Sequence, residues 1–450
     1  MGNFEASNIR VQDLDHCGII AGICDEMGLV GQIDKLLGTH PQEIISPGQV
    51  VKAMILNGLG FLSAPLYLFE KFFVGKATEH LLGEGIRPEH LNDDRLGRIL
   101  DKLAESGLTE TFVSVALRAA RQFGVKLDSL HLDSSSFHVD GEYPQSQAEV
   151  AEPGTIHITH GYSRDHRPDL KQFIVDLMCS GDGDIPLYLR VGDGNETDSA
   201  MFGKLVTQFK QQWNIDALFV ADAALYTAGN LTQKFACQPD ALQAATAFSD
   251  QLPYHQLDDL QVVEIIEDQK RGRPRKDEVG QKHSQISATL IPQPHAIDVE
   301  LQRAGRFILA TNVLNDLVLG DEDVLTEYKA QQSTERGFRF LKDPLFFTSS
   351  IFLNTPQRVA AMAMVMGLCL LVYSLGQRSL RQALDNAKQT VENQVGKSTA
   401  KPTLRWMFQC FMSIHLLTVD GAQHVTNLTT ERLWILQFFG SPCRKYYLLS

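Results

Sequence analysis

The chain has 450 residues, which predicts two or three domains, and 44% of its residues are hydrophobic, enough for a sizeable buried core. Its formal net charge of -13 argues against a protein that coats nucleic acid with its whole surface, and leaves room for basic residues confined to one channel. The seven cysteines include no C-x-x-C pair, which is typical of reduced cysteines in the core of a cytoplasmic protein and argues against a zinc site.

Two features bear on membranes. The first residues lack the basic start and apolar run of a signal peptide. Residues 359–375 form an uncharged stretch of seventeen residues, at the lower limit for spanning a bilayer, with Arg358 and Arg378 close to its ends. We expect a buried core helix there and no membrane partner.

The N-terminal part, from about residue 8 to residue 124, has a helical pattern. Residues 51–58 and 95–103 repeat apolar side chains at intervals of three and four. Ser46-Pro47 and Thr109-Glu110 are typical of helix starts. We predict a separate all-helical domain, whose role the residues alone do not indicate.

Alternating apolar and polar residues begin at Leu130 and predict a sheet. We expect strands at residues 130–141, 171–179, 185–191 and 217–220, a hairpin turn at 180–184, and a helix at 198–213. Asp133 interrupts the first strand, and Asp222 follows the fourth, where a buried strand opens onto a helix. Functional sites gather at such strand ends in open α/β sheets.

The segment from His157 to Leu170 contains three histidines and two aspartates. A metal site is one interpretation, but Arg164 and Arg167 lie among these residues and would repel a cation. We favour a polar loop that contacts phosphate near the active site.

The region from residue 230 to about 320 is mixed. We predict helix at residues 230–258 and strands at 262–266, 284–290 and 305–312. A basic segment at residues 270–276 carries Arg271, Arg273 and Arg275 around one glycine and one proline. Such a segment suits a narrow A·T minor groove, and a solvated loop is an equal alternative. Residues 356–450 are predicted to be helical, with a polar linker at 392–402.

The segment from Tyr328 to Pro344 is predicted to be a helix that proline ends. Tyr328, Glu335 and Lys342 are seven residues apart, so they drift by only about 20° per step and share one face. A solvated surface helix with mixed charges is the simpler alternative for this spacing.

When Asp133 and Asp222 are considered together with Glu335, the sequence favours a functional site over a solvated surface helix. Like charges that converge raise each other's pKa, and divalent cations remove this cost. Mg²⁺ prefers oxygen ligands, and two ions about 4 Å apart promote in-line displacement at a phosphodiester. Lys342, Arg336 and Arg339 would then hold the DNA backbone beside the metal ions.

These residues resemble those of the insertion-sequence DDE transposases, in the group with the signature Tyr-x2-Arg-x3-Glu-x6-Lys. Here the signature positions are Tyr328, Gln331, Glu335 and Lys342. The other similar segments, which appear in the same order, are His131-Leu132-Asp133, Phe137-His138-Val139-Asp140-Gly141, Asp165 to Gln172, Val220-Ala221-Asp222, and Glu335 to Pro344.

The resemblance implies an α/β (α+β) fold, with an RNase H-like catalytic core, a β-rich insertion and flanking helical regions. We accordingly expect five segments: a helical domain at 1–125 that binds element ends, the first part of the core at 126–230, a shortened insertion with the basic loop at 231–305, the end of the core at 306–376, and a helical region at 377–450.

The resemblance also implies activity and partners. Two Mg²⁺ ions, or Mn²⁺, would be held by Asp133, Asp222 and Glu335, and the protein would cut terminal inverted repeats and join their 3′-hydroxyl ends to target DNA. Tyr328, Gln331, Arg336, Arg339 and Lys342 would bind DNA, as would Arg271, Arg273 and Arg275. A homodimer would hold two ends in a synaptic complex on DNA in a prokaryotic cytoplasm.

Two departures from the family pattern leave alternatives open. Gln331 stands where the signature has arginine, which removes one charge that would contact phosphate. Residues 230–258 are short compared with longer relatives, so core strand material could be lacking. The alternatives are a DNA-binding relic without catalysis and a metal-dependent nuclease of the same fold that cuts without joining.

Overall fold

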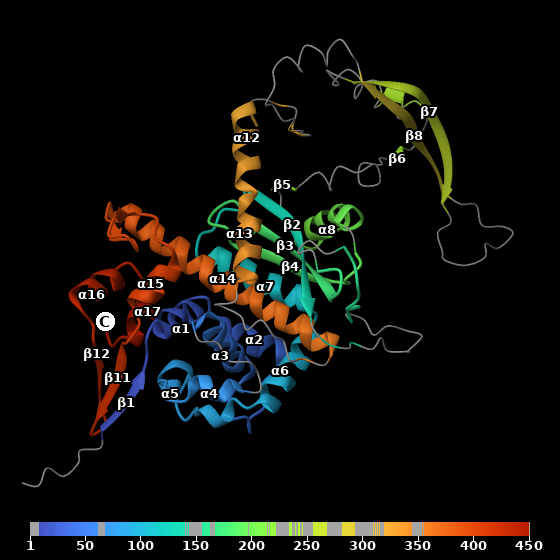
Figure 1. Ribbon diagram of the computed structural model, residues 1–450. Helices are drawn as coiled ribbons and strands as arrows, with labels where there is room; N and C mark the ends of the chain where they lie inside the picture. Colours follow the sequence, from blue (N-terminus) through green and yellow to red (C-terminus); the bar gives the residue numbers. More distant parts are fainter. Residues whose placement is uncertain are drawn as a thin grey trace, which may run out of the picture. The chain divides into compact units, whose positions relative to one another are not determined.

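A computed structural model describes residues 9–61, 68–139, 155–162, 167–196, 198–213, 217–221, 255–267, 281–292, 319–343 and 355–449, with shorter stretches between them (Figure 1). Helices and strands are mixed along the chain, which confirms an α+β class. Contacts divide the chain into two units, one of Met1–Asp222 with Thr326–Ser450 and the other of Ala223–Leu325.

The N-terminal part of the first unit is a layer of helices. These are α1 (Cys17–Glu26), α2 (Leu29–Leu37), α3 (Pro47–Leu59), α4 (Phe69–Phe73), α5 (Thr78–Leu82), α6 (Asp93–Glu105) and α7 (Leu108–Gln122). The predicted start at Ser46 is confirmed, because its side chain and that of Gln49 form a capping box on α3. The start predicted at Thr109 lies one residue inside α7.

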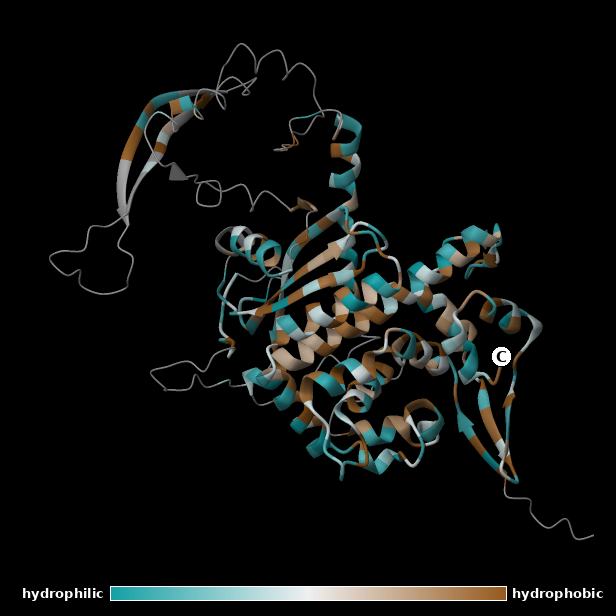
Figure 2. Cartoon of the chain, turned by 180° about the vertical axis from the view of Figure 1, so that it is seen from behind, coloured by the Kyte–Doolittle hydropathy of each residue, from teal (hydrophilic) through white to brown (hydrophobic). Residues whose placement is uncertain are grey.

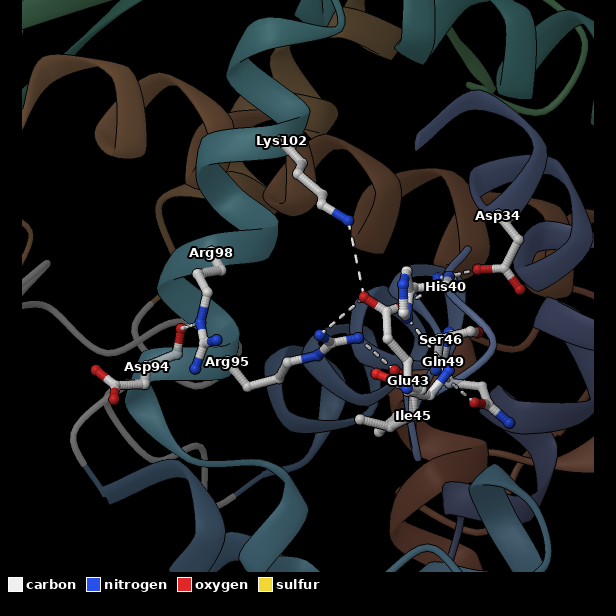
Figure 3. Close-up of polar contacts among 12 residues, drawn as sticks. Asp34, His40, Glu43, Ile45, Ser46, Gln49, Asp94, Arg95, Arg98 and Lys102 are labelled. Carbon is white, nitrogen blue, oxygen red and sulfur yellow. Dashed lines mark hydrogen bonds and ion pairs between the residues drawn. The ribbon is translucent and has the colours of Figure 1, made fainter. Parts of the chain in front are cut away.

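The loop before α3 is fixed by polar contacts with α6 and α2 (Figure 3). Glu43 accepts a hydrogen bond from Arg95 at 3.1 Å and lies 3.8 Å from the ammonium of Lys102. Asp34 accepts a hydrogen bond from the Gly48 amide at 2.7 Å. Gly48 is required at this approach, because a Cβ there would lie 2.3 Å from the Val30 carbonyl oxygen.

The long helix α14 (Pro356–Ala387) passes through the core of the first unit. By length and composition it could cross a membrane, but 89% of its most apolar window is buried inside the fold. Figure 2 shows hydrophobic residues along most of α14 and hydrophilic ones toward its C-terminal end. The prediction of a buried core helix is confirmed.

The chain ends are less helical than predicted. Strand β1 (Ile9–Asp13) pairs with the C-terminal hairpin of β11 (His415–Val419) and β12 (Ala422–Thr426), so the helical prediction is wrong at both places. The hairpin turn is Asp420-Gly421, whose φ angles of 48° and 86° suit the tight turn that Asp-Gly favours. The remaining C-terminal elements are β9 (Val391–Glu392), β10 (Ser398–Thr399), α15 (Leu404–Cys410), α16 (Thr430–Leu436) and α17 (Ser441–Tyr446).

The central sheet of the first unit contains β2 (Ser129–Val139), β3 (Lys171–Ser180), β4 (Pro186–Gly192) and β5 (Leu218–Val220) in the order β4-β3-β2-β5. Strands β2, β3 and β4 pair antiparallel in sequence order, whereas β5 pairs parallel with β2. All four predicted strands are confirmed, as is helix α8 (Asp198–Trp213).

The two faces of this sheet have different partners. Tyr188 of β4 contacts the rings of Phe209 and Trp213 on α8. Leu189 points to the other face, where a Cβ on Gly367 of α14 would lie 2.3 Å from its side chain. Helix α14 therefore lies against the face opposite to the one that α8 covers.

The second unit contains a three-stranded antiparallel sheet in the order β6-β8-β7. Its strands are β6 (Lys234–Phe235), β7 (His255–Glu267) and β8 (Gln281–Pro292). The strands predicted at 262–266 and 284–290 are confirmed within β7 and β8. The helix predicted at 230–258 is wrong at 234–235, which form β6 and pair with β8, and at 255–258, where β7 begins earlier than expected. The strand predicted at 305–312 lies mostly outside the described residues, and Leu309 and Thr311 belong to no element.

Candidate functional site

The segment around Glu335 forms two successive helices, α12 (Asp321–Ala330) and α13 (Gln332–Leu341). They meet at Gln331, which keeps helical angles with φ of -56° and ψ of -22°. The amides of Gln331 and Thr334 bond to carbonyls three residues earlier, so the chain tightens here without reversing. The predicted helix is confirmed, with a junction at the position where the signature has arginine.

Helix α13 packs against β2 and β3 of the central sheet. Gly337 is the point of closest approach, because a Cβ there would lie 2.7 Å from Cδ2 of Leu177 and 3.3 Å from Cδ2 of Leu370. Leu177 lies on β3, and Leu370 lies on α14. Glycine at this position lets α13 lie directly on the sheet beside α14.

Asp133 lies on the sheet face that α13 covers. It is directly opposite Leu177 in the β2–β3 register, and residues opposite each other in an antiparallel pair point to the same face. Since Leu177 meets Gly337, the Asp133 side chain also points toward the α13 face. The carboxylate is half-buried and accepts a hydrogen bond of 2.8 Å from the Ser134 amide.

Two contacts show that α12 and α13 run along β2. Near its start, Nε2 of His131 lies 3.5 Å from a carboxylate oxygen of Glu327 on α12. Near its end, the ammonium of Lys342 lies 5.3 Å from the Phe137 ring centre. The two spans match, since six strand residues cover about 20 Å and fifteen helical residues cover about 22 Å. Glu335 falls between these contacts and is exposed.

Asp222 lies outside the described residues, but β5, the strand that precedes it in the chain, is described. Val220, the last residue of β5, pairs with His131 in the parallel register. Asp222 follows Val220 by two residues, as Asp133 follows His131 by two. Among the described residues, no group of three or more His, Cys, Asp or Glu side chains is placed to hold a metal ion.

His131 and Glu327 were not singled out as site residues from the sequence. His131 is fully buried, and burial lowers its pKa, against the opposing influence of Glu327 and Asp184. Neither ring nitrogen makes a hydrogen bond of normal geometry within the described structure. The segment His131-Leu132-Asp133 carried no sign that the histidine would face α12, because Glu327 lies outside the signature positions.

Arg336 is held by the protein itself. Its guanidinium donates two hydrogen bonds of 2.7 Å to the carboxylate of Asp184, in the turn between β3 and β4. These bonds raise the pKa of Arg336, which therefore stays charged. Sequence reasoning placed Arg336 on the DNA backbone and missed Asp184, since nothing in the turn sequence indicates a partner on a helix 152 residues later.

The other predicted DNA-binding residues divide into two groups. Tyr328 and Arg339 are exposed, and Gln331 is half-buried at the helix junction. Arg271, Arg273 and Arg275 lie outside the described residues.

The predicted polar loop is described at its two ends. The Thr159 and Gln172 backbones exchange two hydrogen bonds, which fix one end to the start of β3. At the other end, Arg167 donates two hydrogen bonds to Asp169 and lowers the pKa of that carboxyl to about 2. Arg164, Asp165 and His166 lie outside the described residues.

Comparisons with known proteins give two results. Residues 9–117 match a family model described as a domain of unknown function, DUF4277. No curated protein matches the chain.

Six chains of solved structures match. One is a piggyBac transposase in a synaptic complex with hairpin DNA, at a TM-score of 0.37 and 9% sequence identity, over 96% of this chain and 82% of that chain. A likeness at this level supports no inference about chemistry.

Proposed function

We propose that this chain is an insertion-sequence DNA transposase that cuts phosphodiester bonds at terminal inverted repeats and joins the ends to target DNA. The observation that carries the proposal is the course of α12 and α13 along β2. It brings the helix of Glu335 to the sheet face that bears Asp133. The two carboxylates are 202 positions apart in the sequence, and the packing of α13 on β2 supports the proposal that they converge.

Asp222 would complete the site. Its offset from the paired residues Val220 and His131 equals that of Asp133, so two further residues of parallel pairing would make the two aspartates neighbours. Carboxylate oxygens are the ligands that Mg²⁺ and Mn²⁺ prefer, so the donor set suits such ions. When bound, two ions would activate the attacking oxygen and stabilise the leaving one.

The reaction has two displacements. In the first, a water oxygen gives up a proton and bonds to phosphorus, the bond to the 3′ oxygen breaks, and the 3′ oxygen takes up a proton and leaves as a hydroxyl. In the second, that hydroxyl gives up its proton, its oxygen bonds to a phosphorus of target DNA, and the displaced 3′ oxygen takes up a proton. No oxidant or cofactor with a redox role is needed for either step.

The chain's own side chains would hold the DNA. Arg339 is exposed on α13, and Lys342 lies at the end of that helix over Phe137. Charged donors at this position would bind phosphate oxygens beside the three acids. A homodimer would be needed to hold two element ends at once.

Strand transfer tests the proposal. The purified full chain would be incubated with Mg²⁺, a target plasmid and labelled duplexes made from the DNA that flanks its gene. We expect labelled ends to become joined to the plasmid. Cleavage without joining would instead indicate a nuclease, and binding without cleavage would indicate a DNA-binding relic, so either result would contradict the proposal.

A further inference from the structure

The ion pair between Asp184 and Arg336 involves the residue next to Glu335 and joins α13 to the turn between β3 and β4. We call this pair the clamp. Both hydrogen bonds measure 2.7 Å, and each carboxylate oxygen receives one of them. This two-bond geometry fixes the direction of the guanidinium as well as its distance.

The turn that carries Asp184 is itself anchored. Asp182, two residues earlier, accepts hydrogen bonds of 3.0 Å and 2.6 Å from Arg378 of α14 and one of 2.9 Å from the Lys126 amide. Arg378 also donates to the carbonyls of Phe123 and Gly124. Asp184 has a φ of 58°, a conformation that aspartate tolerates better than most residues. The turn is therefore a fixed point against which α13 can be held.

The clamp acts on rotation of α13 about its own axis. Gly337 sets how closely the helix approaches Leu177, and the buried side chains of Phe338 and Leu341 limit its rotation to small angles. Arg336 points toward the β3–β4 turn, whereas Lys342 reaches Phe137 of β2 on the other flank. Glu335 is seven residues before Lys342, so the two share one side of the helix, and both are exposed. Because Arg336 is the next residue on the same rigid helix, holding its side chain also fixes the direction in which Glu335 points.

A small rotation would matter for chemistry. A helix with its side chains has a radius of about 5 to 6 Å, so a turn of about 20° moves a side-chain tip by about 2 Å. Misplacement of a reacting group by about 1 Å can cost on the order of 10²-fold in rate. The α12–α13 junction at Gln331 makes this relevant, because its tightened turn separates α13 from the preceding helix.

We propose that Asp184 and Arg336 are positioning residues, whose ion pair sets the rotation of α13 and so places Glu335 beside Asp133. This inference rests on the proposed function. It assigns Arg336 to the protein's own framework, where the sequence alone suggests a contact with the DNA backbone. The side chain of Arg336 is 50% exposed, and an ion pair so open to solvent contributes little to the free energy of unfolding. Its removal should therefore change catalysis more than stability.

A double-mutant cycle of D184N, R336Q and the double variant tests this inference. Each removes one charge without adding bulk, and asparagine tolerates the φ of position 184. We expect each single variant to cut flanking-DNA duplexes with Mg²⁺ about 10 to 100-fold more slowly at saturating DNA, with dissociation constants within about two-fold of wild type. The double variant should be no slower than either single one, since both lose the same contact.

The matched control is D101N. Asp101 of α6 accepts two hydrogen bonds of 2.7 Å from Arg358 of α14, so this pair has the geometry of the clamp at a place away from Glu335. We expect D101N to cut DNA at the wild-type rate. R336K, which keeps the charge but has a single donor group, should recover part of the rate that R336Q loses.

Three outcomes would overturn the inference. They are a wild-type rate in D184N, a weaker DNA affinity in R336Q with no change in D184N, and a double variant much slower than both single ones. The second and third would make Arg336 a phosphate contact. If wild type itself cuts no DNA, the proposed function fails. The rate of amide hydrogen exchange in α13 then tests separately whether the clamp holds this helix. Faster exchange in D184N than in D101N would support it, and equal exchange would refute it.

Discussion

Single residues decide how closely the elements of the candidate site approach. Gly337 brings α13 to Leu177, the residue that faces Asp133 across the β2–β3 pair. The identity of this glycine therefore bears on the distance between Glu335 and the sheet. The sequence alone assigned no role to Gly337, because a helical pattern does not show which side chains a glycine within it will contact.

We predict that G337A lowers the midpoint of thermal unfolding, whereas G31A raises it. An added Cβ at Gly337 would overlap Leu177, at a cost of about 1 to 3 kcal/mol, against a gain in helix propensity of about 1 kcal/mol. Gly31 in α2 has no atom within 4 Å of such a Cβ, so only the gain remains. A stabilised G337A would show that the sheet contact is not tight.

His16 supplies a pH dependence. Its ring is buried against Phe61 and Phe408, and burial lowers its pKa to about 4, although a hydrogen bond with the Leu59 carbonyl opposes this change. Below pH 6.5 the unfolded chain binds a proton at this residue that the folded chain does not. Stability is therefore lost as pH falls from about 6.5 to about 4, by roughly 3 kcal/mol in total.

We predict that H16Q removes this part of the pH dependence. Urea unfolding of wild type and variant at pH 7, 6, 5 and 4 measures it, and the difference between the two proteins cancels the titration of other groups. The free energy of unfolding of H16Q minus that of wild type should increase as pH falls. Parallel curves over this range would contradict the buried, uncharged state of His16.

At the scale of elements, the C-terminal helix α17 completes the N-terminal layer by packing on α1. Lys52 of α3 donates hydrogen bonds to Asp25 at 2.6 Å and to the Tyr446 hydroxyl at 2.8 Å, and that hydroxyl donates to Asp25 at 2.5 Å. Burial and the nearby carboxylate raise the pKa of Tyr446, so its hydroxyl stays protonated. The three side chains tie three helices together.

We predict that Y446F destabilises the protein more than Y447F does. Tyr446 bonds to a charged carboxylate, which makes its hydrogen bond worth about 1.5 to 3 kcal/mol, whereas Tyr447 donates at 2.7 Å to the neutral carbonyl of Asp15, worth about 1 kcal/mol. Thermal unfolding of the two variants gives the comparison. Equal losses would mean that the charge of Asp25 adds nothing.

Elements with a strong local pattern could be predicted from the sequence, and pairings between distant segments could not. The alternation in β2, β3 and β4 and the apolar run in α14 led to correct elements. The Asp420-Gly421 turn had a local signal that was missed, whereas the pairing of β1 with β11 has none, since it joins residues about 400 positions apart. At the candidate site, the seven-residue spacing around Glu335 predicted a helix. The contact between Arg336 and Asp184 could not be predicted, because only the fold brings these two side chains together.

At the scale of the whole molecule, the chain is folded back on itself. Residues 326–450 belong to the same unit as residues 1–222, and they supply both the core helix α14 and the helix of Glu335. The candidate site therefore depends on segments from both halves of the sequence. The expected boundaries at residues 125, 230, 305 and 376 stay predictions, as does the DNA-end binding assigned to residues 1–125.

The most direct test of the central claim compares single-turnover cleavage by wild type, D133N, D222N and E335Q on flanking-DNA duplexes with Mg²⁺. Each substitution keeps the shape of the side chain and removes its charge, and D101N is the control. We predict that the three variants lose cleavage by at least about 10²-fold, keep the wild-type unfolding midpoint within a few degrees, and still bind DNA. Cleavage at the wild-type rate by any of the three would contradict the account.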